Sequence, residues 1–161
     1  MKILLSSDVL LDLLYDNEYS QDIRKLLYLA QEGHIEAAIS CHSFVELSGH
    51  VSSEVLYQTL GVLSSFVSLI DLSRKDVRKA CRSKDFYEGL YRVLAVRHEA
   101  DYVVSRRIKR DIHSTIRVTD PRELRKLVED GKTDQQRRDI QRESHSCRKR
   151  RSGTGRREQS L

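Results

Sequence analysis

The stretch that decides the fold is MKILLSSDVLLDLL, residues 1–14. Its apolar run Lys2–Leu5 has the length and composition of a buried strand, and Val9–Tyr15 continues with helical spacing. Two serines and Asp8 stand between these two segments. In open α/β sheets, ligands bind beyond the carboxyl ends of the strands, so this polar turn is a candidate edge of a functional site.

The same alternation of short apolar runs and helical segments continues along the chain. A helix is expected from Ser20 to Gly33, and Ser73, Asp85 and the Asp120-Pro121 pair have the residue types that begin helices. Short apolar runs between helices are typical of a parallel sheet. We therefore predict a three-layer α/β fold with helices on both faces of the sheet. The further expected strands are Ala37–Ser40, Val67–Leu72, Tyr102–Ser105 and Ile116–Val118.

Composition excludes several classes of protein. The chain has 161 residues, of which 39% are apolar and 33% are charged, so it can bury a core. It has no run of 18 apolar residues, which argues against a membrane span. The three cysteines are odd in number and form no C-x-x-C pair, which indicates reduced thiols in a cytoplasmic protein.

The positive charge is concentrated near the end of the chain. From Glu129 onward there are ten basic and six acidic residues, which leaves only +1 of the total +5 for residues 1–128. After about Asp130 the apolar periodicity disappears. We predict a domain at 1–130 and a disordered basic tail at 131–161, which either contacts nucleic acid or is simply a solvated end.

Acidic side chains are expected at the carboxyl edge of the predicted sheet. Asp8 follows the first strand, Glu46 lies shortly after the second, and Glu88 stands in the first turn of the helix that Asp85 opens. Carboxylates gathered at one edge bind Mg²⁺ or Mn²⁺, and such ions activate water at a phosphodiester. The alternative is purely structural, with Asp8 and Asp85 as helix N-caps and Glu46 and Glu88 as ordinary solvated carboxylates.

Five segments in order resemble the PIN domain, a family of metal-dependent ribonucleases known from bacterial toxin–antitoxin pairs. The resemblance covers about residues 1–128 and implies a PIN-like parallel sheet, Mg²⁺- or Mn²⁺-dependent endoribonuclease activity, and an antitoxin-like protein or a second copy as partner. Asp8, Glu46 and Glu88 fall on or beside its acidic positions. The segments are ILLSSDVLLDLL, SCHSFVEL, KDFYEGL, ADYVVSRRIK and TIRVTDPREL.

Two positions depart from the family pattern. Ser6 stands where the first metal-binding aspartate belongs, and Arg107 stands where the family has asparagine or aspartate. Arg110 replaces a further aspartate, and Asp111 could substitute only if the loop shifts by one residue. Two unit charges 4 Å apart interact by about 4 kcal/mol at an effective dielectric constant near 20, so an arginine here would repel a divalent ion.

Two functions follow from these residues. In the first, the chain is an endoribonuclease in which Asp8, Glu46 and Glu88 hold the metal, with catalysis impaired or lost. In the second, it is a non-catalytic module that binds RNA or a protein partner. Arginine forks onto phosphate oxygens, so the cations after the fourth strand would then contact RNA directly. These cations are Arg106, Arg107, Lys109 and Arg110.

Overall fold

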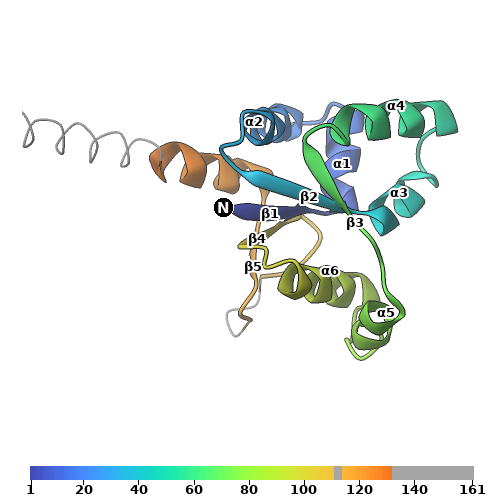
Figure 1. Ribbon diagram of the computed structural model, residues 1–161. Coiled ribbons are helices and arrows are strands. Elements are labelled where there is room, and N and C mark those ends of the chain that lie inside the picture. Colours follow the sequence, from blue (N-terminus) through green and yellow to red (C-terminus); the bar gives the residue numbers. More distant parts are fainter. Residues whose placement is uncertain (111–113, 132–161) are drawn as a thin grey trace, which may run out of the picture. The chain divides into compact units, whose positions relative to one another are not determined.

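A computed structural model describes residues 1–110 and 114–131 (Figure 1). Residues Met1–Arg125 form one compact unit that contains the sheet and helices α1–α6. The helix at 121–131 crosses the predicted domain boundary, and the predicted tail lies, apart from Gly131, outside the described residues. Asp111 lies outside them as well. The strands are β1 (Lys2–Leu5), β2 (Glu36–Ser40), β3 (Val67–Ile70), β4 (Tyr102–Val104) and β5 (Arg117–Thr119). The helices are α1 (Ser7–Leu14), α2 (Ser20–Gln31), α3 (Cys41–Leu47), α4 (Ser53–Leu63), α5 (Arg74–Ala80) and α6 (Phe86–Arg97).

The five strands form one parallel sheet in the order β3-β2-β1-β4-β5. The strand β1 is central, and its last residue Leu5 pairs with Ile39 of β2 and Val104 of β4. The chain builds outward from β1 to β3 and then returns to the other side of β1 through β4. This reversal places a topological switch point between β1 and β4, where ligand sites of such sheets are found.

Helices cover both faces of the sheet. Figure 1 shows α1, α2 and α4 over one face and α5 and α6 over the other. Successive side chains of β1 point to opposite faces, so Leu4 packs under α6 while Ile3 and Leu5 are buried on the other side. The predicted α/β architecture with two helical layers is thereby confirmed. The core beneath α6 includes Leu4, Tyr87, Leu90, Tyr91, Leu94, Val103 and Val118.

The predicted helix starts at Ser73, Asp85 and Asp120 are confirmed. The Ser73 side chain forms a capping box with Asp76, and Asp85 accepts a hydrogen bond from the Glu88 amide at 3.1 Å. Asp120 accepts from the Glu123 amide at 2.9 Å. These caps depend on residues three positions apart, which is why the sequence alone reveals them.

The first helix differs from the prediction. It begins at Ser7, its N-cap is Ser6, and the Ser6 side chain makes no capping bond. Asp8 therefore lies inside the first turn, and the alternative in which it serves as the N-cap is wrong. The strand β3 ends at Ile70 rather than Leu72, and β5 is displaced by one residue toward Thr119. In the described part of the chain, no helix combines the length and apolarity needed to cross a membrane.

Candidate functional site

The polar cluster at the switch point begins with Ser6, the residue that follows β1. Its side chain is fully buried, and its hydroxyl donates to the backbone oxygen of Val104 at 2.8 Å. The Ser6 amide donates to the same oxygen at 3.1 Å, which extends the pairing of β1 with β4 by one residue. The Ser6 hydroxyl also contacts the carboxylate of Asp8. A serine here therefore joins the two central strands at the edge of the sheet.

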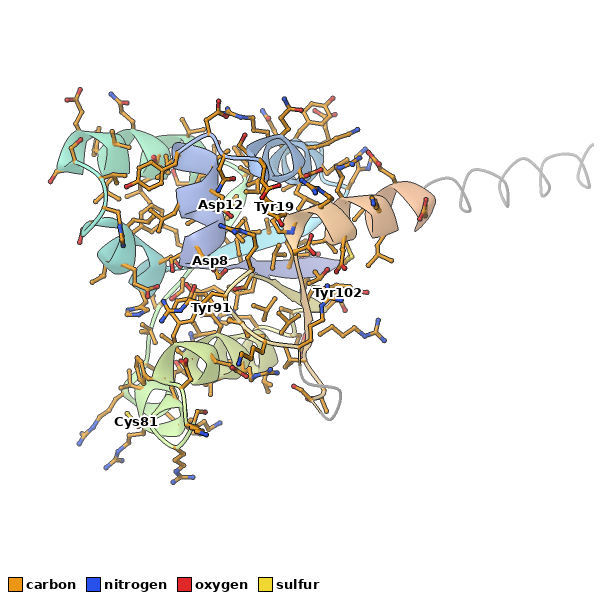
Figure 2. All side chains as sticks on the ribbon, turned by 180° about the vertical axis from the view of Figure 1, so that it is seen from behind. Asp8, Asp12, Tyr19, Cys81, Tyr91 and Tyr102 are labelled. Carbon is orange, nitrogen blue, oxygen red and sulfur yellow. The ribbon has the colours of Figure 1, made fainter. Side chains whose placement is uncertain are left out.

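The carboxylate of Asp8 is the centre of this cluster. It accepts hydrogen bonds from four groups of α6 and of the loop that follows β4, and it also contacts the Ser6 hydroxyl; Figure 2 labels it on α1. These donors hold the start of α1 against the loop that follows β4. They are the hydroxyls of Tyr87 (2.8 Å) and Ser105 (3.1 Å), and the amides of Arg106 (2.7 Å) and Arg107 (3.2 Å).

Two tyrosines of α6, Tyr87 and Tyr91, contact the residues of this cluster. Burial raises the pKa of the Tyr87 hydroxyl well above its usual range, and the nearby Tyr91 and Asp8 raise it further. Burial likewise raises the pKa of Tyr91. Tyr87 therefore stays protonated and donates to Asp8, while the Tyr91 hydroxyl accepts from the Ser7 amide at 3.0 Å and contacts Ser43 at 2.8 Å.

Glu46 reaches the same cluster from α3. Its carboxylate accepts a hydrogen bond from the Ser7 hydroxyl at 2.6 Å, and the Ser7 hydroxyl lies 3.1 Å from that of Tyr87. The imidazole of His42 lies 3.9 Å from the same Glu46 oxygen, one helical turn away. Glu46 and Asp8 are thus linked through Ser7 and Tyr87.

Glu88 has different partners from Asp8 and Glu46. Its carboxylate forms an ion pair of 2.9 Å with Arg92, four residues further along α6. Arg92 also donates to the Ser114 hydroxyl at 2.7 Å and the Lys109 backbone oxygen at 3.0 Å. Arg92, which Glu88 holds in place, therefore ties α6 to the segment before β5.

The predicted cations are mostly engaged within the protein. Arg106 forms a two-pronged pair with the buried Asp12, and this hydrogen bonding raises the pKa of the Arg106 guanidinium. Arg110 pairs with Glu123. The guanidinium of Arg107 instead lies over the Tyr87 ring, 4.0 Å from its centroid, and is exposed. Lys109 is also exposed.

These residues do not fit a divalent metal ion. A carboxylate offers about four lone-pair positions, and the four donors on Asp8 occupy them. Glu88 is neutralised by Arg92, which leaves Glu46 as the acid with spare capacity. Mg²⁺ and Mn²⁺ prefer several oxygen ligands with net negative charge. Among residues 1–110 and 114–131, no three His, Cys, Asp or Glu side chains are grouped closely enough to hold a metal ion.

Sequence reasoning missed several members of the cluster. Tyr87 and Tyr91 lie one turn apart on α6, and this spacing was a signal that both face the same way. Ser105 directly follows β4, the position at which a site residue is expected. Asp12 could not be found this way, because its partner Arg106 is 94 residues away.

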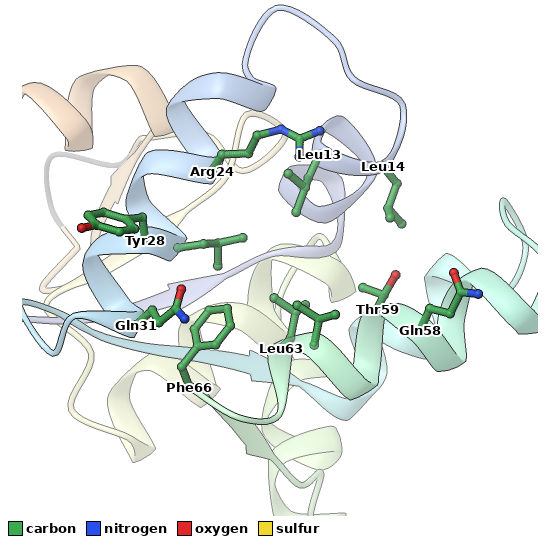
Figure 3. Close-up of a pocket in the computed structure, with 11 residues that line it drawn as sticks. Leu13, Leu14, Arg24, Tyr28, Gln31, Gln58, Thr59, Leu63 and Phe66 are labelled. Atoms are coloured by element: carbon green, nitrogen blue, oxygen red, sulfur yellow. The ribbon is translucent and has the colours of Figure 1, made fainter.

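A separate apolar groove lies between α1, α2 and α4 (Figure 3). Its volume is about 490 Å³, and its walls include Leu13, Tyr28, Val62 and Phe66. Tyr28 is 58% exposed and Val62 is 64% exposed, so the groove presents apolar surface to solvent. It is on the opposite face of the sheet from α6 and does not include the Asp8 cluster.

Comparison with known proteins supports the fold. No family model and no curated protein sequence matches the chain. Among solved structures, it is similar to a chain of the crystal structure of VapBC2 from Rickettsia felis bound to a DNA fragment from their promoter. The TM-score is 0.55 with 18% identity, over 74% of this chain and 98% of that one. The likeness concerns the fold, and it agrees with the predicted three-layer α/β sheet with helices on both faces.

Proposed function

We propose that this protein is a PIN-like module that binds RNA without cutting it. The single observation that carries the proposal is the saturation of Asp8 by four hydrogen-bond donors of the protein itself. The endoribonuclease reaction of the family needs a divalent ion at this edge. In this chain, hydroxyls, backbone amides and an arginine occupy the surroundings of the acid that would hold it.

The charge at the edge also favours a phosphate over a metal ion. Arg107 lies over Tyr87, beside Asp8, and makes no ion pair among the described residues. A guanidinium that is held on an aromatic ring keeps its donors free for a phosphate oxygen. Arg106 and Arg110 contribute positive charge to the same loop, although their guanidinium groups are already paired.

The experiment is an RNA cleavage assay with Mn²⁺. It compares the natural protein, a Ser6→Asp/Arg107→Asp double variant and Glu46→Ala. We expect the natural protein to bind single-stranded RNA without cleaving it, because no pair of carboxylates remains free to hold Mn²⁺. Mn²⁺-dependent cleavage by the natural protein that Glu46→Ala abolishes would contradict the proposal. Cleavage by the double variant alone would support it.

A protein partner is a second candidate, favoured by the apolar groove between α1, α2 and α4. The similar solved structure is of VapBC2 bound to a DNA fragment. Together with the resemblance to toxin–antitoxin proteins, this supports an antitoxin-like protein or a second copy as the partner that we propose for the groove. Sedimentation velocity over a range of concentrations tests the second copy. Val62→Gln in the groove should weaken self-association, whereas Val45→Gln, at a similarly exposed valine outside it, should not. If the protein is a monomer at all concentrations, the second copy is excluded as the partner and the antitoxin-like protein remains.

A further inference from the structure

The helix α5 and the loop after it carry an unusual concentration of positive charge. Residues 73–84 contain six cations and one acid, which is a net charge of +5 in twelve residues. Residues 1–128 carry 19 cations and 18 acids, so the remainder of that range has 13 cations and 17 acids, a net charge of −4. The six cations, all exposed, are Arg74, Lys75, Arg78, Lys79, Arg82 and Lys84.

The fold directs these cations outward. Asp76 and Ala80 form the inner side of α5, where they are 3% and 0% exposed, and α5 packs there against α6. The four cations within α5 lie at the remaining positions, three and four residues apart, and therefore share the outer side, while Arg82 and Lys84 follow in the loop after the helix. Figure 2 shows side chains with nitrogen ends spreading outward around Cys81.

The single acid of the segment does not neutralise them. Burial acts to raise the pKa of Asp76, but hydrogen bonds from Ser73 and the charge of Arg97 outweigh it and lower the pKa overall. Asp76 is thus ionised and forms an ion pair of 2.5 Å with Arg97 of α6. Among the residues that the structure describes, none of the six outward cations forms an ion pair.

A cavity with both polar and apolar walls adjoins this surface. It has a volume of about 430 Å³ and lies between α5, α6 and the segment before β5. Lys75 and Lys79 line it together with the hydroxyl residues Ser83 and Ser114. Small-molecule sites have volumes of about 300–1,000 Å³, so this cavity is within the size range of a ligand site and lies beside the cations.

We infer that α5 and the loop to Lys84, here called the α5 basic surface, bind the backbone of single-stranded RNA. The inference rests on the proposed RNA-binding function and names the surface that performs it. A helix of seven residues is about 10 Å long, so its outer side can follow only a few consecutive phosphates of one strand. Membrane-binding helices insert a broad apolar face, whereas the outer side of α5 offers only Val77, which is 38% exposed.

The test measures binding of the full chain to a labelled single-stranded RNA of about 20 nucleotides by fluorescence anisotropy over a range of salt concentrations. The variant Arg74→Gln/Arg78→Gln/Arg82→Gln is compared with Lys2→Gln/Arg24→Gln/Arg117→Gln, which removes the same charge elsewhere. Loss of three phosphate contacts should weaken binding about 10- to 100-fold and lower the salt slope by about 2. The control should change affinity less than about threefold, and circular dichroism melting confirms that both variants are folded.

Several results would overturn the inference. Equal loss in both variants would show that total charge, rather than this surface, decides binding. An unchanged affinity of the α5 variant would overturn it as well, while leaving RNA binding by the protein intact. Tighter binding of duplex DNA, or loss of binding to phosphatidylserine vesicles without loss of RNA binding, would assign the surface to another partner. Absence of RNA binding by the natural protein would contradict the proposed function and this inference together.

Discussion

At the scale of single residues, Asp8 joins separate parts of the chain. Its oxygens accept hydrogen bonds from α6 and from the loop after β4, so one carboxylate of α1 connects three parts of the chain. The sequence correctly predicted that Asp8 lies at the carboxyl edge of the sheet. It could not reveal the donors, because Tyr87 and Arg106 are 79 and 98 residues away in the chain.

Replacement of Asp8 tests this role. Asp8→Asn turns an amide group toward the converging donors, and hydrogen bonds to a charged acceptor contribute about 1.5–3 kcal/mol each. We expect the free energy of unfolding, measured in urea, to fall by about 2–4 kcal/mol. The matched control Asp85→Asn should change it by less than about 0.5 kcal/mol, because asparagine is an equally good N-cap.

A metal site would respond differently to Asp8→Asn. Acids gathered for a metal repel each other when no ion is bound, so removal of one charge leaves stability unchanged or raises it. A variant at least as stable as the natural protein would therefore contradict the structural role.

At the scale of elements, local signals were sufficient for most of the fold and insufficient for the packing between helices. The caps at Ser73 and Asp85 and the stop at Gly33 are readable because each involves neighbours in the chain. The start of α1 was misplaced by two residues, because Ser6 is held by β4 rather than by a capping bond. Burial and tertiary contacts, rather than neighbours in the chain, decide where a helix such as α1 begins.

The contact between α5 and α6 depends on Gly89. A Cβ atom at this position would lie 2.3 Å from the Ser83 hydroxyl and 3.0 Å from the Ala80 backbone oxygen. Gly89→Ala should lower the free energy of unfolding by about 1–3 kcal/mol, although alanine alone favours a helix by about 1 kcal/mol. Chemical denaturation measures this change.

Gly61 supplies the matched control for Gly89. It lies in α4 with no atom within 4 Å of an added Cβ, so Gly61→Ala should raise stability by up to about 1 kcal/mol. The double variant Ser83→Gly/Gly89→Ala should recover part of the loss, since it removes the nearer obstacle. Equal effects of Gly61→Ala and Gly89→Ala would show that helix propensity, rather than the contact with α5, governs position 89.

At the scale of the whole molecule, the chain combines a parallel α/β sheet with charges in unusual places. Ser6 and Arg107 stand at the edge of the sheet where the PIN pattern has acidic or amide residues, while residues 73–84 carry a net charge of +5. The sequence showed the first feature through its motifs. The sequence did not show the α5 basic surface. Which side of α5 faces solvent is known only from the burial of Asp76 and Ala80 in the structure.

The central claim is that the protein's own donors occupy Asp8 and leave no site for a divalent ion. The measurement that tests it most directly is the effect of Mn²⁺ on the free energy of unfolding. A site with a dissociation constant one hundredth of the Mn²⁺ concentration would add about 2.7 kcal/mol of stability. Because the protein's own donors occupy Asp8, we predict a change of less than about 0.5 kcal/mol in 1 mM Mn²⁺. A stabilisation of about 2 kcal/mol or more that disappears in Glu46→Ala would contradict the account.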